Sequence, residues 1–379
     1  MVILKSFIIL ILITAKAYSS ISIPQSNFPV DYEMRKRVNF WKKVYTEINT
    51  NRGYIHDTDR PWIIYENISL KGLNRKKANK KIKHLTYRVK LALNKLAKRK
   101  KNKQSIHKMK YANLVGNLSV KNIRKSASKI RFQRGMSDRF YKGHKKAFKY
   151  LDHMKKIFTT KSLPLELTYL PHVESSFNIK AHSKSDAVGI WQVLKPIGRK
   201  LGLMINQDID ERLDPIKSSR AAALLLKENY KVLGSWPLAV TAYNTGPAIL
   251  RRAVKKLKTS NLSTIVEKFR ARNWGFASRN FYATFVAVTE VSININKYAN
   301  LRSWKKESPI SFQSIKTTEV YPLPKLLKAL GKYKNEFIDL NPAIRKRSFK
   351  KRVLIPRDFT LHLPSELISK KGEILKQLK

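Results

Sequence analysis

The feature that most constrains the fold is a set of helix start and stop signals in the apolar second half of the chain. Asp214 followed by Pro215 is a helix start, because an aspartate side chain can cap free backbone amides and proline fits the first turn. The alanine- and leucine-rich segment that follows ends at Gly234, a residue typical of helix ends. Pro237 starts another helix, which is expected to stop at Thr245-Gly246. This region is therefore predicted to be almost entirely helical.

Two further helices are expected in the same region. Pro164 fits the first turn of a helix that ends near Glu174, and Pro171 is expected to kink it because proline removes a backbone donor. The apolar segment from Phe276 to Tyr298 predicts another helix. Side chains at helix ends can reach into a cleft, so Glu174 and Asn244 emerge at suitable points.

Four short motifs follow one another along this helical region. They are Glu174-Ser175-Ser176, Gly189-Ile190-Trp191-Gln192, Ala242-Tyr243-Asn244 and Arg279-Asn280-Phe281-Tyr282. Their order and spacing resemble the family 1 lytic transglycosylases of bacterial cell-wall metabolism, especially the murein transglycosylase D type. The resemblance covers roughly Phe140 to Asn300, and four motifs in order are a specific signal where any one alone is weak. It implies a mostly α fold with a lysozyme-like (goose-type, SLT) catalytic domain over residues 140–304.

The resemblance assigns catalysis to Glu174. Breaking a glycosidic bond requires a proton on the leaving oxygen and stabilisation of an oxocarbenium-like centre. A glutamic acid can supply that proton near neutral pH only where apolar surroundings raise its pKa. In the family, the sugar's own 6-hydroxyl then attacks the anomeric carbon and the same glutamate turns from acid to base. One carboxylate suffices, and Asp208, Asp210, Glu211 and Asp214 are expected to be structural.

Five more residues are predicted to orient the glutamate or bind the substrate. Ser175 is expected to orient the carboxylate, with capping of the helix end as the alternative. Gln192 offers both donor and acceptor groups to an N-acetyl or hydroxyl group. Tyr243 and Asn244 are expected to line the cleft. Tyr282 matches the tyrosine of the fourth motif and is expected to hydrogen-bond the glutamate, although an aromatic residue on an apolar helix is more often part of the core.

Other residue types are expected to have structural roles. Trp191 is either a sugar-stacking platform or a core residue, and His172 is expected to pack. The chain has no cysteine, which excludes disulfides, thiolate metal sites and a cysteine nucleophile. The histidines show no metal-ligand spacing. Neither a metal nor a cofactor is therefore expected.

Residues 1–17 are predicted to be a cleaved signal peptide. Lys5 supplies the positive charge, Phe7 to Ile13 the apolar core, and Ala15-Lys16-Ala17 the small-x-small cleavage pattern. The apolar run is too short to span a bilayer comfortably, and an uncleaved anchor is the alternative. Transglycosylases of the D type are often anchored through a lipidated cysteine, which is absent here. We expect an exported or periplasmic protein with no stable membrane anchor.

Residues 18–139 are predicted to form a basic and mostly helical arm. No acidic residue lies between Glu66 and Asp138, and the whole chain has a formal net charge of +54. Five apolar residues recur there at helical spacing, which argues for an amphipathic helix: Ile82, Leu85, Val89, Leu93 and Leu96. Such charge ordinarily suggests nucleic acid, yet no nucleic-acid-binding fold is recognisable. Peptidoglycan strands and anionic cell-envelope polymers are the expected partners, and nucleic acid is not.

Residues 309–365 resemble a LysM-like glycan-binding module with a strand-helix-helix-strand outline. The similarity lies in Leu340-Asn341-Pro342 and Leu354-Ile355-Pro356. A structural cap on the catalytic domain is the alternative. A small α+β module is expected in either case.

These expectations together predict a peptidoglycan lytic transglycosylase. It would cleave the β-1,4 bond between N-acetylmuramic acid and N-acetylglucosamine without water, leaving 1,6-anhydro-N-acetylmuramic acid ends. The alternatives are a hydrolytic muramidase on the same fold and a basic wall-binding protein with an inactive domain. Reaction products separate the first two, and the intact Glu174 with its motifs argues against the third.

Overall fold

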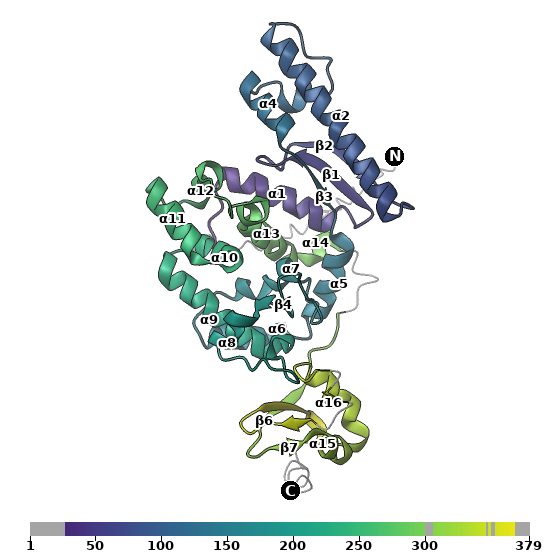
Figure 1. The fold of residues 1–379 in the computed structure, drawn as a ribbon, viewed down its shortest axis with the longest axis vertical. Coiled ribbons are helices and arrows are strands. Elements are labelled where there is room, and N and C mark those ends of the chain that lie inside the picture. Colours follow the sequence, from purple (N-terminus) through teal and green to yellow (C-terminus); the bar gives the residue numbers. More distant parts are fainter. Residues whose placement is uncertain (1–26, 300–305, 346–347, 350–352, 368–379) are drawn as a thin grey trace, which may run out of the picture.

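The structure is a computed structural model that describes residues 27–299, 306–345, 348–349 and 353–367. The predicted signal peptide, residues 1–17, lies outside the described residues. Among those that are described, no helix combines the length and the apolar character needed to cross a membrane. Figure 1 shows a small sheet with helices at one end of the molecule, a helical body in the middle and a small α+β module at the other end.

The helical body confirms the expectation of a mostly α fold. Its helices are α1 (Tyr32–Thr46), α5 (Ser137–Ala147), α6 (Leu151–Thr159), α7 (Pro171–Glu174), α8 (Lys195–Lys200), α9 (Pro215–Leu233), α10 (Trp236–Thr245), α11 (Pro247–Leu257), α12 (Leu262–Lys268), α13 (Phe276–Ile293) and α14 (Ile295–Tyr298). Short 3-10 helices span Leu165–Tyr169 and Glu211–Leu213, and the strands β4 (Ala187–Val188) and β5 (Val193–Leu194) form a two-stranded antiparallel sheet. One continuous apolar core joins these elements.

The helix signals of the sequence are confirmed in α9 and α10. The Asp214 carboxylate accepts hydrogen bonds from the backbone amides of Ile216 and Lys217, at 2.8 and 3.0 Å. Gly234 ends α9 with a φ of 70°, a conformation that glycine adopts at no steric cost. α10 then begins one residue before Pro237.

Two expected helices are interrupted. The chain after Pro164 forms a 3-10 helix, and α7 starts anew at Pro171, because this proline cannot donate the next backbone hydrogen bond. The predicted helix of residues 276–298 is divided at Asn294 into α13 and α14. α7 nevertheless ends at Glu174, as expected.

The N-terminal region differs from the expected helical arm in two ways. It contains a three-stranded antiparallel sheet of order β2-β1-β3, formed by β1 (Arg52–Asp57), β2 (Ile64–Ser69) and β3 (Ile130–Arg134). In addition, α1 lies upstream of the expected boundary at residue 140 but packs along α13 in the core of the helical body. α1 is therefore part of that body, because its apolar side is buried there.

The amphipathic helix of the arm is confirmed as α2 (Arg75–Lys101). Val89, Leu93 and Leu96 are buried against α4 (Val120–Ser128) and the sheet, while α3 (Ala112–Val115) lies in the connection between the two helices. These residues form a second apolar core, separate from that of the helical body.

The C-terminal module has its own core and the expected order of elements. β6 (Phe312–Lys316) pairs with β9 (Thr360–Pro364), and β7 (Tyr321–Pro322) pairs with β8 (Leu354–Ile355). Between the paired strands lie α15 (Leu323–Ala329) and α16 (Lys334–Leu340). This is a strand-helix-helix-strand outline with an additional outer strand on each side.

Acidic residues of the helical body hold this module. Asp210 forms an ion pair with Arg212 at 2.9 Å, and its second oxygen pairs with Arg345 of the module at 2.9 Å. Asp214, besides capping α9, lies 3.2 Å from the ring of His362. The structural role predicted for these two carboxylates is thus visible in their contacts.

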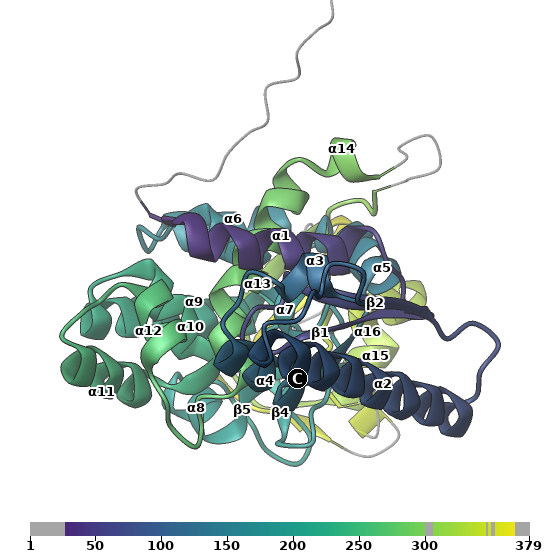
Figure 2. The same ribbon diagram turned by 90° about the horizontal axis from the view of Figure 1, so that it is seen from above.

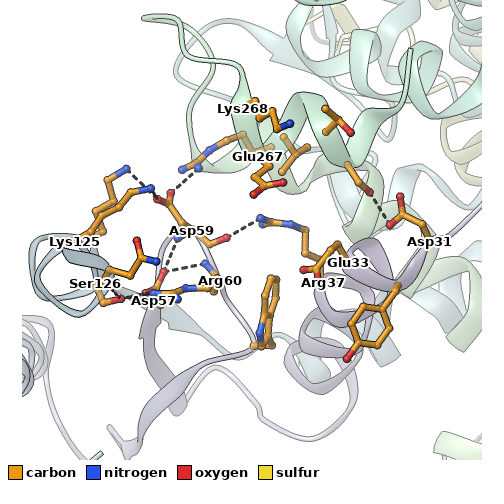
Figure 3. Close-up of a pocket in the computed structure, with 18 of the residues that line it drawn as sticks. Asp31, Glu33, Arg37, Asp57, Asp59, Arg60, Lys125, Ser126, Glu267 and Lys268 are labelled. Atoms are coloured by element: carbon orange, nitrogen blue, oxygen red, sulfur yellow. Dashed lines mark hydrogen bonds and ion pairs between the residues drawn. The ribbon is translucent and has the colours of Figure 1, made fainter. Parts of the chain in front are cut away.

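Another acidic residue, Asp59, joins the sheet region to the helical body through its cationic partners. Asp59, in the turn between β1 and β2, pairs with Arg279 of α13 at 2.7 Å and with Lys125 and Lys129 at 3.1 Å each. Its carbonyl oxygen accepts a hydrogen bond from Arg37 of α1. Burial alone would raise the pKa of Asp59, but the bonds from the three cations hold it well below the usual value. Figure 3 shows Asp59 at the centre of this network, on the wall of a cavity of about 760 Å³ between the two regions.

We expect Asp59→Ala to lower the free energy of unfolding by about 2–4 kcal/mol, because it leaves the nearly buried Arg279 without its carboxylate partner. Urea unfolding followed by circular dichroism measures the change. Glu228→Ala is the matched control, since Glu228 of α9 forms an exposed pair with Lys200 and its loss should leave the midpoint in place. Equal midpoints for both variants would contradict the role assigned to Asp59.

Candidate active site

Glu174 is the last residue of α7, and the backbone turns sharply after it. Ser176 and Phe177 have φ values of 52° and 53°, in the left-handed region that is unusual for residues other than glycine. Helix α5 packs closely on this turn: a Cβ at Gly143 would lie 2.3 Å from the Ser176 carbonyl oxygen. Only glycine at position 143 permits this approach. The position of the glutamate is therefore fixed by local strain and by close packing.

The carboxyl group of Glu174 lies without a charged or hydrogen-bonding partner in the part of the chain that the structure describes. Its side chain is half-buried, open on one side and densely surrounded by protein elsewhere. Burial raises the pKa of Glu174 to about 8. No neighbouring charge contributes to this rise, so a second carboxylate does not lie close by. The group is therefore a neutral acid at neutral pH.

Two tyrosines, the buried Tyr45 and the partly buried Tyr243, lie near this carboxyl group. Burial raises the pKa of both Tyr45 and Tyr243, and the negative charge of Glu174 raises it further. Tyr45 belongs to α1, far upstream in the sequence, and was not among the predicted site residues. The only signal for it is the apolar spacing of Val38, Trp41 and Tyr45 along a helix. Nothing in that spacing distinguishes a cleft residue from a core residue.

Ser175 does not orient the carboxylate as expected. Its hydroxyl group donates to the carbonyl oxygen of Ile190 at 2.9 Å, which joins the end of α7 to the turn between β4 and β5. Gln192 of that turn has a φ of 48°, and its amide nitrogen donates to the carbonyls of Gly189 and Ala181 at 2.9 and 3.3 Å. Both donor hydrogens of the Gln192 amide are thereby used, and its oxygen remains as an acceptor.

Tyr243 and Asn244 lie at the end of α10, and the neighbouring Trp191 belongs to the core. The Tyr243 hydroxyl donates to the Trp191 carbonyl at 2.8 Å. The Trp191 side chain is fully buried, donates to Ser219 at 2.7 Å and stacks on Phe158, so it offers no face to a sugar. Asn244 is exposed, and its side-chain oxygen accepts a hydrogen bond from a serine of α13.

The prediction that Tyr282 hydrogen-bonds Glu174 is wrong. Tyr282 is buried, and its hydroxyl group donates to the carbonyl oxygen of Pro29 at 3.0 Å. α13 is buried on nearly every side, so an apolar side chain fits any of its faces. Position 282 faces the segment that precedes α1 and not the end of α7. The structure thus brings together Glu174, Ser175, Gln192 and Tyr243, places Asn244 at the adjoining helix end and leaves Tyr282 outside the group.

His172 packs in the core, as expected. It is fully buried and packs against the tilted ring of Phe140 and edge-on against Phe177, and its Nε2 lies 3.1 Å from Nδ1 of His144. Burial, with a smaller effect from His144, holds the pKa of His172 well below the usual value. As a neutral, buried side chain, His172 packs α7 against the apolar core.

The cavity of Figure 3 is a different place from this group. Of the predicted motifs, only Arg279 lines it, and Arg279 is already paired with Asp59. The acid chemistry of Glu174 therefore belongs to the end of α7 and not to this cavity.

We expect Glu174→Gln to stabilise the protein increasingly as the pH rises. In the wild type the folded-state pKa of about 8 exceeds the ordinary value of 4.5, so the folded state retains a proton that the unfolded chain releases. Stability is then lost as the pH rises through this window, and glutamine removes that loss. The advantage of the variant should reach about 2–4 kcal/mol at pH 8, less than the full shift because the group is open on one side.

Urea unfolding at pH 5 and pH 8 measures this difference. Glu228→Gln is the control, because Glu228 is an exposed partner of Lys200 and its loss should leave the wild-type pH dependence intact. A Glu174→Gln protein whose stability follows the same pH dependence as the wild type would show that the carboxyl group is not destabilised by burial.

Comparison with known proteins agrees with the motif assignment. A family model described as the transglycosylase SLT domain matches residues 151–266. The membrane-bound lytic murein transglycosylase D of Escherichia coli (strain K12) is 38% identical over 105 residues, which are 27% of this chain and 23% of that protein. A relative from Alteromonas sp. (strain M-1), named for tributyltin chloride resistance, is 34% identical over 110 residues, 29% of this chain and 53% of that protein.

Among solved structures, the 70 kDa soluble lytic transglycosylase SLT70 from Escherichia coli is similar at 18% identity and a TM-score of 0.33, over 42% of this chain and 27% of that one. The matched part of this chain spans about a quarter of the length of the Escherichia coli transglycosylase D and about half of the Alteromonas protein. Glu174, the turn of Gln192 and the end of α10 all lie inside the matched segment. The part of this chain that carries the candidate acid is therefore similar to transglycosylase SLT domains.

Proposed function

We propose that the protein is a peptidoglycan lytic transglycosylase. It cleaves the β-1,4 bond between N-acetylmuramic acid and N-acetylglucosamine without water and leaves 1,6-anhydro-N-acetylmuramic acid ends. The observation that supports this function is the isolated carboxyl group of Glu174, whose pKa burial raises to about 8 inside the SLT domain. A single protonated acid suits this reaction, whereas most glycosidases use two carboxylates.

The reaction requires Glu174 to act twice. As the neutral acid it donates its proton to the glycosidic oxygen while the bond to the anomeric carbon breaks. The resulting carboxylate then accepts the proton of the 6-hydroxyl group as that oxygen bonds the anomeric carbon. The proton returns to Glu174 and no water is consumed. An intramolecular nucleophile gains roughly 7–11 kcal/mol over a bimolecular encounter.

The surrounding residues support these steps in distinct ways. Tyr45 and Tyr243 lie close enough to Glu174 for its negative charge to raise the pKa of both, and they belong to the surroundings that bury the acid. In this proposal the amide oxygen of Gln192, which has no hydrogen-bond donor among the described residues, accepts from an N-acetyl or hydroxyl group, and Asn244 offers its amide to the glycan at the exposed end of α10. Ser175 acts indirectly, since it holds the turn of Gln192 against α7.

A hydrolytic muramidase on the same fold is the second candidate. It requires a carboxylate to activate water, and Asp208 and Asp210 are the residues to consider. Asp210 is bound by Arg212 and Arg345, and Asp208 accepts a hydrogen bond from Ser348. Both side chains are therefore engaged at the contact with the C-terminal module, which favours the lytic reaction. A basic wall-binding protein without turnover is the third candidate.

Export to the periplasm, with peptidoglycan strands as substrate, follows from this function. The C-terminal module suits glycan binding of the LysM type through its strand-helix-helix-strand order, and its contacts through Asp210 and Asp214 suit a capping role equally. The basic arm attracts the protein to anionic groups of the envelope, such as stem-peptide carboxylates.

The products of digestion test the proposed reaction. Mass spectrometry of muropeptides released from purified peptidoglycan should find 1,6-anhydro-N-acetylmuramic acid ends without a reducing end, each one water lighter than the products of a lysozyme. Digestion of the same material by a lysozyme serves as the reference. Predominantly reducing-end products would move the protein to the hydrolytic muramidases.

Glu174→Gln should reduce turnover by about 10²–10⁴-fold and leave binding to peptidoglycan nearly unchanged, because glutamine keeps the shape but cannot transfer a proton. For the wild type, the rate should fall as the pH rises above about 8, where the acid loses its proton. Release of soluble muropeptides and co-sedimentation with peptidoglycan measure the two properties. Glu228→Gln is the control, and a Glu174→Gln protein of near wild-type activity would rule out Glu174 as the acid.

A further inference from the structure

Helix α2 presents an exposed basic face at the end of the molecule farthest from the C-terminal module (Figure 1). The helix contains no acidic residue, and lysine or arginine takes most of its exposed positions. At about 1.5 Å per residue, its 27 residues extend roughly 40 Å. Seen from above, α2 lies across the front of the helical body (Figure 2). This face is a long, continuous surface of positive charge.

The opposite face of α2 is fixed by the fold. Val89, Leu93 and Leu96 pack into the second apolar core, and the Lys100 ammonium group donates to the carbonyl oxygen of Leu118. The helix is therefore anchored in an ordered position, and its basic face does not depend on a partner to become helical. A preformed surface loses little conformational entropy when it binds.

Two apolar side chains lie in the middle of the basic face. Tyr87 and Leu91, one helical turn apart, are 59% and 49% exposed. Residues at a spacing of four lie on the same side of a helix, and Lys80, Lys83 and Lys90 flank them there. A hydrated polyanion would contact the lysines alone. A bilayer surface takes both kinds of group, with ammonium groups at the phosphates and apolar side chains among the acyl chains.

We propose that this face of α2 binds reversibly to the surface of an anionic lipid bilayer. The lysines contact the phosphates of the headgroups, and Tyr87 and Leu91 enter the interface between them. Such binding needs neither a membrane-spanning helix nor a lipid anchor, and its strength follows the fraction of anionic lipid and the ionic strength. It is independent of the catalytic proposal, because Glu174 lies at the end of α7 in the helical body, whereas α2 packs in a separate apolar core.

Flotation with vesicles tests the proposal on the full-length protein. The protein should bind vesicles of phosphatidylglycerol and phosphatidylcholine, should release them at high salt, and should not bind phosphatidylcholine alone. Replacing Lys80, Lys83 and Lys90 together by glutamine should weaken binding on the order of a hundredfold, at about fivefold per lysine. The matched control replaces Lys255, Lys256 and Lys258, which are exposed at the end of α11, well apart from α2 in both views (Figures 1 and 2), and should change binding by less than about twofold.

The apolar pair separates a bilayer from a soluble polyanion. Tyr87→Ser combined with Leu91→Ser retains every charge and should weaken vesicle binding about tenfold, while binding to long-chain polyphosphate stays unchanged. Both side chains are exposed, so circular dichroism should show an intact fold. Vesicle binding that is equal in this variant and the wild type would overturn the proposal in favour of a hydrated polyanion. An equal loss in the α11 control would overturn it in favour of unspecific charge attraction.

Discussion

The packing of α1 along α13 is the interaction on which the rest of the structure depends. Asn280 of α13 accepts hydrogen bonds from Arg37 and Trp41 of α1, and Glu290, three turns further on, pairs with Arg35 and Lys42. Between these polar contacts the two helices share the main apolar core. The C-terminal end of α1 places Tyr45 near Glu174, and its N-terminal half places Arg37 at the carbonyl of Asp59. A helix from the beginning of the described chain thus completes the site and also joins the sheet region to the body.

The site around Glu174 has a conformation that is locally unfavourable and that the surrounding packing maintains. A carboxyl group that is buried without a partner would be solvated if the turn after α7 could relax, and Ser176 and Phe177 lie in a region of φ that costs energy. Close packing by α5 at Gly143 and the bond from Ser175 to Ile190 prevent that relaxation. The result is a carboxyl group whose proton is retained at neutral pH because ionisation inside the protein is costly. In the proposed reaction, this local loss of stability is what makes proton transfer from Glu174 possible.

The sequence predicted the parts of this arrangement that depend on local chemistry. The Asp214 cap, the Gly234 end of α9, the amphipathic α2 and the end of α7 at Glu174 each follow from a few neighbouring residues, and each is confirmed. The sheet was not predicted, because its strands are short and β3 pairs with β1 across the whole basic arm. Tyr45 was missed and Tyr282 misplaced for the same reason: which side of a buried helix faces the acid is decided by its tertiary neighbours. Ser175 shows the same limit, since its partner Ile190 belongs to another motif.

The few acidic residues of the chain lie mainly at contacts between its parts, and this leaves the surface of α2 without negative charge. The chain has 25 aspartates and glutamates against 79 lysines and arginines. Several of the few carboxylates form ion pairs between parts of the structure. Asp59 binds the sheet region to α13, Glu290 binds α1 to α13, and Asp210 binds the C-terminal module. A carboxylate that is already paired with two or three cations at such a contact cannot also neutralise lysines elsewhere on the surface. α2, which has no acidic residue, therefore keeps the full repulsion among its lysines, and its buried apolar side must outweigh that repulsion for the helix to form. Binding of an anionic surface relieves the repulsion, so the same charges that destabilise the free arm supply the free energy of its attachment.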